Sequence, residues 1–190
     1  PDVSSVPGRF RDLGAYAWAR AAIEELAARG IISGTTDTTF SPGESIRRGD
    51  FVALLMRMLG TGAPAETAFS DVPANSYYFK EIAQARSLGI AAGTGEDRFH
   101  PDAPITRQEM ITFVMRAMEQ TGYIQVGSRR DDLRGFQDAA LVADYARESV
   151  SAAVANGLIV GADGRLNPQM NTTRAEAAVF LHGVLKAHGV

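Results

Sequence analysis

The stretch Ile105-Thr106-Arg107-Gln108-Glu109-Met110-Ile111-Thr112-Phe113-Val114 joins a helix start signal to the beginning of an apolar helix face. Thr106 and Glu109 have the spacing of a capping box, in which the hydroxyl accepts from the third helical amide and the carboxylate accepts from the N-cap amide. Apolar residues then recur every three or four positions as far as Met118, which is the period of an α-helix. The stretch therefore predicts an amphipathic helix that begins near Arg107.

The same pattern occurs three times, each time at the end of a longer repeated unit. A unit opens with Phe-x-Asp, continues with an aromatic residue and a Gly-x-x-x-Gly segment, and reaches a proline two positions after an apolar residue. It closes with an arginine, an acidic residue two positions later and a mostly apolar segment. The closing triplets are Arg48-Gly49-Asp50, Arg107-Gln108-Glu109 and Arg174-Ala175-Glu176. Self-similarity of this depth indicates three tandem repeats.

Each repeat is expected to form a helix, a glycine turn, a loop and a second helix. In the first repeat Trp18, Ile23 and Leu26 share a helix face, and Gly30 stands where a left-handed cap would end that helix. The second helices are apolar over a wide arc, which predicts that they pack against one another. We therefore expect an all-α fold of three helix–loop–helix repeats.

The predicted repeats span residues 1–62, 63–128 and 129–190. A unit of about 55 residues buries too little surface to be comfortably stable alone. The sequence therefore predicts one cooperative module with a shared core. A monomer is expected, because the apolar helix faces are satisfied within one chain.

Composition restricts the functional classes. The 190 residues carry a formal net charge of −3, which argues against nucleic-acid binding through bulk basicity. Of the 19 basic residues 17 are arginines, the side chain suited to bidentate recognition of carboxylate or phosphate. There is no cysteine and no apolar stretch long enough to insert into a membrane. The acidic loops lack calcium-loop spacing and the histidines lack zinc-ligand spacing, so neither a metal site nor a cofactor is predicted.

An arginine at the start of each second helix is the leading candidate for ligand binding. These residues are Arg48, Arg107 and Arg174. A cation in the first helical turn opposes the helix dipole, so helix capping does not account for it. An anion bound there would accept hydrogen bonds both from free backbone N–H groups of the helix and from the arginine guanidinium. The alternative is that each arginine bridges two repeats through Asp12, Asp71 or another carboxylate.

Further candidates occupy equivalent positions in the repeats. Thr106 and Thr173 stand beside the arginines, although capping alone explains them. The aromatic residues Trp18, Tyr77 and Tyr145 either stack on sugar faces or belong to the core. The glycines Gly34, Gly93 and Gly161 either allow a positive φ or let backbone amides approach a ligand. The aspartates Asp12, Asp71 and Asp138 are expected to be turn or cap residues.

The ordered set of F-x-D, an aromatic residue, G-I-x-x-G, F-x-P and I-T-R-x-E resembles the S-layer homology (SLH) domain in a tandem of three, from Phe10 to about Gly189. The resemblance implies a non-catalytic module that anchors a surface-layer protein or exoenzyme to the bacterial cell wall. It implies binding of a secondary cell-wall polysaccharide, commonly with a pyruvate ketal, in grooves between repeats. It also implies a pseudo-threefold spindle around a central three-helix bundle, and an extracellular location at the cell wall or S-layer.

Two departures from this pattern predict unequal repeats. The first copy has Arg47 and Asp50 in place of the usual threonine and glutamate, which predicts a weakened groove at Arg48. The third copy has His182 where the other second helices have methionine, which places a polar group on the expected bundle face.

Two other functional classes stay open at this point. A helical repeat adaptor would bind protein and have no affinity for wall glycan. A glycosidase would need a unique pair of carboxylates about 5–9.5 Å apart. Most of the carboxylates singled out above occur in threes at equivalent positions, as expected of scaffold or binding roles.

Overall fold

The computed structural model describes residues 8–60, 68–124 and 133–189. Its helices are α1 (Ala17–Ala28), α2 (Arg48–Leu59), α3 (Phe79–Ser87), α4 (Arg107–Gln120), α5 (Asp144–Ala155) and α6 (Arg174–His188), with short 3₁₀ helices η2 (Gly14–Tyr16) and η3 (Ala139–Leu141). These ranges contain isolated β-bridges but no strand, so the predicted all-α fold of three repeats is confirmed. The predicted repeat boundaries at 62/63 and 128/129 lie outside the described residues.

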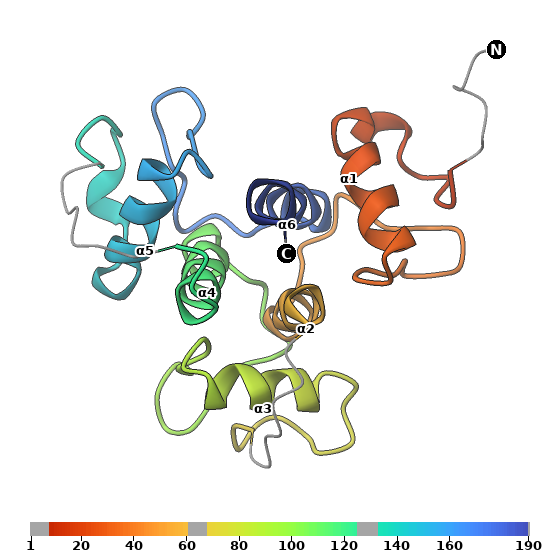
Figure 1. Cartoon of the computed structure of the whole chain (residues 1–190), viewed down its shortest axis with the longest axis horizontal. Coiled ribbons are helices and arrows are strands. Elements are labelled where there is room, and N and C mark those ends of the chain that lie inside the picture. The colour runs from red at the N-terminus through yellow and green to blue at the C-terminus, as the bar shows by residue number, and fades with distance from the viewer. Residues whose placement is uncertain (1–7, 61–67, 125–132, 190) are drawn as a thin grey trace.

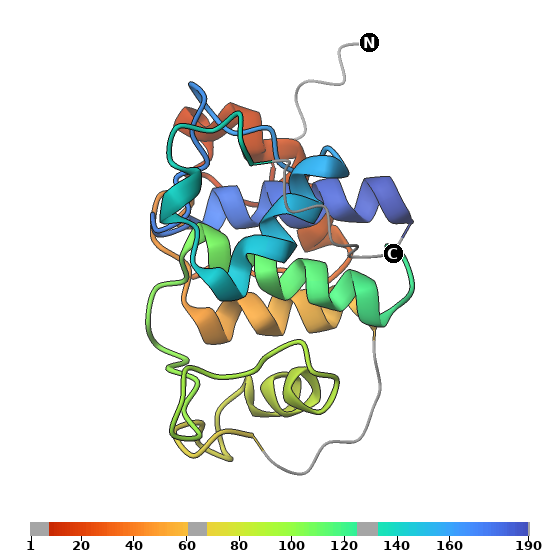
Figure 2. The ribbon, with the colours of Figure 1, turned by 90° about the vertical axis from the view of Figure 1, so that its left-hand side faces the viewer.

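The second helix of each repeat lies at the centre of the molecule. Figure 1 looks nearly along α2, α4 and α6, with α1, α3 and α5 around them. The side view in Figure 2 shows the three central helices next to one another, and α2 contacts both α4 and α6. The expected central three-helix bundle is confirmed.

The outer helices pack on central helices of other repeats. α3 packs on α2 and α5 packs on α4, so each of these first helices lies on the second helix of the preceding repeat. α1 packs on α6, which joins the first described helix to the last (Figure 1). The repeats therefore interleave and close in a ring, an arrangement that supports our proposal of one cooperative module.

The central helices are buried on two sides, by the bundle and by an outer helix. This accounts for their wide apolar arcs, which a single packing partner would not require. Buried apolar residues on these helices include Phe51, Leu55, Met56, Met110, Val114, Met115, Ala177, Leu181 and Val184. Within the described ranges, no helix has both the length and the apolar content that crossing a membrane requires.

An aspartate near the start of each repeat holds the F-x-P loop of that repeat. The carboxylate of Asp12 accepts hydrogen bonds from the backbone N–H groups of Phe40 and Ser41 at 2.9 and 2.7 Å. Asp71 and Asp138 accept the equivalent pairs of bonds in the other repeats. Burial would raise the pKa of each carboxyl, but these N–H groups outweigh it and the pKa is lowered. The three aspartates lie in turns, as predicted, but their carboxylates bind a loop 28 and 29 residues further along the chain, which the sequence did not predict.

Three backbone hydrogen bonds link the repeats in a cycle just before the central helices. The N–H of Ile46 donates to the carbonyl of Thr172, that of Thr172 to Ile105, and that of Ile105 to Ile46, at 2.9 to 3.0 Å. We call these three residues the axial ring. The side chain of Thr172 is fully buried, and its hydroxyl has no hydrogen-bond partner in the part of the chain that the structure describes.

Thr172→Val is expected to stabilise the fold, whereas Thr173→Val is expected to destabilise it. The first change keeps the side-chain shape and removes an unsatisfied buried hydroxyl, for a gain of about 1 kcal/mol. The second removes the oxygen that accepts from the N–H of Glu176 at 3.2 Å and caps α6, at a cost of about 1 kcal/mol. Urea unfolding of the two variants measures both changes in free energy. A shift of the same sign in both would contradict the prediction.

Candidate functional site

The first amides of the central helices are already hydrogen-bonded to the next repeat. In α2 the N–H groups of Arg48 and Gly49 donate to the carbonyls of Ala103 and Pro101 at 2.9 and 2.8 Å. The equivalent bonds of α4 run to Met170 and Pro168, and those of α6 run to Glu44 and Pro42. The expectation that free helix amides receive an anion here is wrong, because loop carbonyls of the neighbouring repeat occupy them.

The arginines that begin the central helices also link repeats through their side chains. In each case Nε donates to the carbonyl of the apolar residue in the F-x-P loop of the next repeat, at 2.8 to 3.0 Å. The pairs are Arg48 with Phe99, Arg107 with Leu166, and Arg174 with Phe40. All three arginines therefore bridge repeats through backbone carbonyls, and the predicted bridge through a carboxylate is present only for Arg48, which pairs with Glu109.

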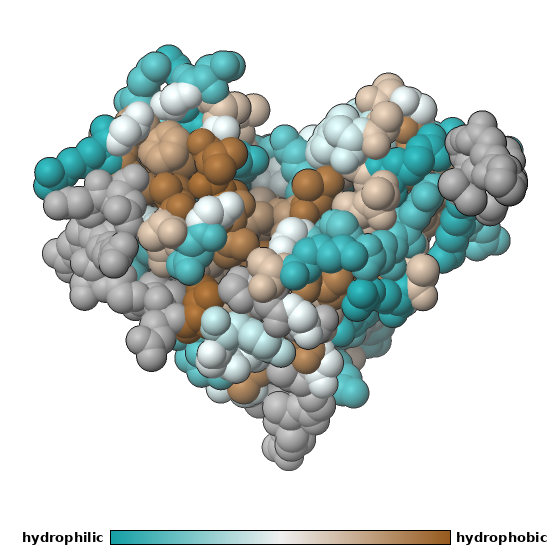
Figure 3. Space-filling view, turned by 45° about the horizontal axis from the view of Figure 1, so that its top comes forward, coloured by the Kyte–Doolittle hydropathy of each residue, from teal (hydrophilic) through white to brown (hydrophobic). Residues whose placement is uncertain are grey.

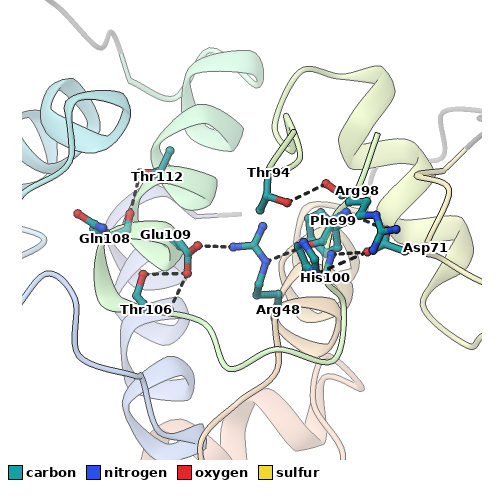
Figure 4. Close-up of polar contacts among 10 residues, drawn as sticks. All are labelled: Arg48, Asp71, Thr94, Arg98, Phe99, His100, Thr106, Gln108, Glu109 and Thr112. Atoms are coloured by element: carbon teal, nitrogen blue, oxygen red, sulfur yellow. Dashed lines mark hydrogen bonds and ion pairs between the residues drawn. The ribbon is translucent and has the colours of Figure 1, made fainter. Parts of the chain in front are cut away.

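Arg48 is the most enclosed of the three, with 4% of its surface exposed. Its guanidinium forms an ion pair of 2.6 Å with Glu109 and lies 4.8 Å from the ring centre of Phe99 (Figure 4). Glu109 in turn accepts hydrogen bonds from the backbone N–H and the hydroxyl of Thr106, both at 2.8 Å. Burial lowers the pKa of Arg48 and the charge of Glu109 opposes that change. Arg48 is thus a buried link between the first two repeats.

Three equivalent grooves surround the bundle, and each contains residues of all three repeats. We name each groove by its arginine. The Arg48 groove, of about 360 Å³, joins Gly93 and Glu109 of the second repeat to Tyr145 of the third. The Arg107 groove, of about 490 Å³, contains Gly161, Glu176 and Trp18, and the Arg174 groove, of about 290 Å³, contains Gly34, Asp50 and Tyr77. The predicted arginines, aromatic residues and glycines therefore all line these grooves.

The two threonines predicted beside the arginines have a different place. Thr106 and Thr173 form the expected capping boxes at the starts of α4 and α6. Neither lines a groove, but each holds a groove carboxylate, Glu109 or Glu176, through its backbone N–H and its hydroxyl. They are positioning residues in this structure.

The groove aromatic residues are exposed. Trp18 is 59% exposed, Tyr77 65% and Tyr145 53%, so the alternative that they belong to the core is wrong. The hydroxyl of Tyr77 donates to Asp50. Partial burial of this phenol and the neighbouring carboxylate together raise the pKa of Tyr77. An aromatic side chain with a free face beside polar groups suits a ligand that is apolar on one side and polar at its edge.

The groove glycines are needed for close packing. A Cβ on Gly93 would lie 2.7 Å from both the Arg98 carbonyl oxygen and the Phe69 ring, and its φ is 76°. Gly161 has the same kind of contacts and a φ of 71°. At Gly34 a Cβ would lie 2.3 Å from the Thr36 carbonyl oxygen, although φ there is not positive. The predicted positive φ therefore holds in two repeats, and steric exclusion of a side chain holds in all three.

The departure at Asp50 falls in a different groove from the one predicted. Asp50 lies in the Arg174 groove, whereas Arg48 faces a full-length glutamate, Glu109. The predicted weakening of the Arg48 groove by Asp50 is therefore wrong, because a helix presents its first and third residues to different neighbours. Arg47 makes no side-chain capping bond and forms an exposed ion pair with Asp102 at 3.2 Å.

His182 contacts the first helix. Its Nε2 lies 2.8 Å from Oε2 of Glu25 on α1, and Nζ of Lys186 lies 3.0 Å from the same oxygen. Hydrogen bonds with His182 and Lys186 lower the pKa of Glu25 to about 2. The polar group expected on the bundle face belongs instead to the contact between α1 and α6.

Sequence reasoning missed a set of groove residues on the outward side of the central helices. Thr112 and Arg116 line the Arg48 groove, and Arg57 lines the Arg174 groove. The available signal was an arginine nine positions after the groove arginine in two helices that are otherwise mostly apolar. Residues 8–60, 68–124 and 133–189 contain no group of three or more side chains placed to hold a metal ion.

Three tandem helical repeats share one central bundle, and the three grooves lie between the repeats. The S-layer homology domain family matches residues 9–52, 68–111 and 135–178, which is more than half of the chain. The chain belongs to the S-layer homology domain family.

Curated relatives include S-layer proteins and enzymes. The chain is 31% identical to the surface-layer 125 kDa protein of Lysinibacillus sphaericus over 85% of this chain and 14% of that protein. It is 27% identical to S-layer protein EA1 of Bacillus anthracis over 98% of this chain and 21% of that protein. It is 34% identical to an amylopullulanase of Thermoanaerobacterium thermosulfurigenes over 90% of this chain and 9% of that enzyme.

The chain spans less than a quarter of the length of these relatives. The match to the amylopullulanase therefore covers only a small part of that enzyme. A chain built of S-layer homology repeats fits an anchoring module and not a catalytic one. The family and its S-layer members indicate an extracellular location at the cell wall or S-layer, as the resemblance implied.

Proposed function

We propose that the three grooves bind a secondary cell-wall polysaccharide that carries an acidic substituent such as a pyruvate ketal. The observation that carries the proposal is the pairing, in every groove, of an exposed aromatic residue with an arginine across a concave surface. The aromatic face offers apolar area to one side of a sugar ring. The arginine offers charge-assisted hydrogen bonds to a carboxylate.

The arginines would bind the ligand through those guanidinium N–H groups that are not already bonded within the protein. Their Nε atoms are taken by loop carbonyls, which fixes the plane of each guanidinium. In the Arg174 groove one terminal nitrogen also donates to the carbonyl of Ser33 at 3.0 Å. A guanidinium held in place in this way loses little freedom when a ligand binds, so the ligand contact costs less conformational entropy.

Glycoside hydrolysis is disfavoured by the groove carboxylates. Among the described lining residues, each groove contains one carboxylate, namely Glu109, Glu176 or Asp50. Hydrolysis generally uses two carboxyl groups in one site. In addition, Glu109 is paired with Arg48 and Asp50 accepts from Tyr77, which engages both in the fold.

Tyr145→Ala is expected to weaken binding to cell walls about tenfold, which corresponds to about 1.4 kcal/mol. The residue is 53% exposed, so the folded state should change little. The measurement is sedimentation of the protein with cell walls isolated from Lysinibacillus sphaericus, with and without extraction of their secondary polysaccharide. Tyr123→Ala is the matched control, because Tyr123 is 43% exposed and lies outside the three grooves.

Two outcomes would count against the proposal. Equal binding to extracted and intact walls would show that the polysaccharide is not the ligand. Equal losses in the two tyrosine variants would remove the role of the groove. Binding to a purified S-layer protein but not to walls would favour the helical adaptor instead.

A further inference from the structure

The three grooves have equivalent arginines but different charge. Nine residues after each groove arginine stands Arg57, Arg116 or Gly183. Each lines a groove together with the acidic residue of its own helix: Arg57 the Arg174 groove, Arg116 the Arg48 groove and Gly183 the Arg107 groove. Two of the grooves therefore contain a second arginine and the third contains none.

The two second arginines are not in the same electrostatic state. Nε of Arg57 lies 3.1 Å from Oε1 of Glu81 on α3, so its charge is balanced. Arg116 is partly buried, and its side chain makes no hydrogen bond or ion pair with any residue that the structure describes. The position equivalent to Glu81, four residues after the groove aromatic, is Ser149 on α5, which packs on α4. The acidic partner present in one groove is thus missing from the other.

The Arg48 groove consequently contains one unbalanced positive charge. Arg48 and Glu109 neutralise each other at 2.6 Å, and Arg116 is left over. Arg116 and Tyr145 line the same groove, where burial raises the pKa of the Tyr145 phenol and the charges of Arg48 and Arg116 oppose that rise. The cation therefore lies beside the aromatic residue on which a sugar would rest.

The Arg107 groove has no second arginine among its described lining residues, and its wall is more apolar. Val179, Phe180 and Gly183 stand where the Arg48 groove has Thr112, Phe113 and Arg116. Its wall also includes Leu158 and Val160, the latter 81% exposed. Figure 3 shows the surface hollowed between the lobe that contains α5 and the lobe that contains α1, with apolar residues gathered along it.

We infer that Arg116 gives the Arg48 groove the strongest preference for an anionic sugar among the three grooves. The anion is a carboxylate or a phosphate on the glycan, read by Arg116 beside the ring of Tyr145. This inference rests on the proposed function for its physiological ligand, but its direct test does not need the wall polymer. Arg116 is thereby a specificity-determining residue.

The test uses the amide signals of Gly34, Gly93 and Gly161 in NMR spectra of the full chain, because each groove contains one of these glycines. The probes are glucuronate for a carboxylate, glucose 6-phosphate for a phosphate, and glucose as the neutral sugar. We expect the anionic sugars to shift Gly93 selectively and glucose to show no such preference. Arg116→Gln should weaken the Gly93 response about tenfold. Arg57→Gln is the matched control and should leave that response unchanged.

A second variant tests the charge without removing the arginine. Ser149→Glu installs the partner that Arg57 has in Glu81, and it should reduce the anion response at Gly93 to a similar extent. Equal shifts of all three glycines by glucuronate, or an unchanged Gly93 response in Arg116→Gln, would overturn the inference. Selective Gly93 shifts in a protein that fails to bind walls would instead uphold the inference and reject the proposed polysaccharide function.

Discussion

Removal of the third repeat, from Phe136 onward, is expected to abolish cooperative folding of the remaining chain. The deletion takes away α6, on which α1 packs, and α5, which covers α4. It also opens the axial ring, because Thr172 takes part in two of its three hydrogen bonds. Two apolar helix faces then lose their packing partners and meet water, which removes hydrophobic burial from a domain whose net stability is small. Sedimentation velocity and thermal unfolding of the truncated chain measure the outcome.

The full chain is the control for this deletion, and it is expected to sediment as a monomer with one unfolding transition. Self-association or a molten, non-cooperative state of the truncated chain agrees with a shared core. A soluble truncated monomer that unfolds cooperatively would show that the repeats are independent domains.

Arg48→Ala is expected to cost about 3–5 kcal/mol of folding free energy, because it leaves the partner of a buried ion pair uncompensated. Glu109 would lose its 2.6 Å partner, and the carbonyl of Phe99 would lose its donor. For a domain of this size the melting temperature should fall by about 6–20 °C. Arg47→Ala is the neighbouring control, since its ion pair with Asp102 is exposed and such pairs contribute roughly 0–1 kcal/mol.

Similar melting temperatures for the two arginine variants would contradict the structural role of Arg48. The sequence predicted a weakened groove at Arg48, which concerns ligand binding, whereas this prediction concerns folding. This prediction also means that loss of wall binding in Arg48→Ala does not by itself report on ligand contact. Binding by that variant has to be compared at a temperature where it is fully folded.

The spacing of residues within a repeat correctly predicted the structural features that form between residues close together in the sequence. The Thr106–Glu109 and Thr173–Glu176 capping boxes and the three central helices follow from local hydrogen bonds and helix period, and all are present. Such features involve residues that the sequence itself places close together.

Contacts between repeats were the part that the sequence could not predict. Neighbours in the chain, Arg48 and Asp50, lie in different grooves, and Tyr145 joins Arg48 from two repeats away. The hydrogen bonds from the helix amides to the carbonyls of Pro101 and Ala103 could not be predicted either. The sequence of a repeat does not indicate which loop packs against the start of its second helix. Exposure of Trp18 follows from the same cause, since its ring lies over a groove that another repeat completes.

The contact of α1 with α6 has a consequence for the time course of folding. Glu25 and His182, which bond across that contact, are 157 residues apart in the chain. Contacts of such long sequence separation slow folding, because the entropy of closing the loop is lost before the contact forms. During synthesis and export α1 stays without its partner until α6 has emerged. Every groove contains residues of all three repeats, so the three grooves form together and only after α6 has packed on α1.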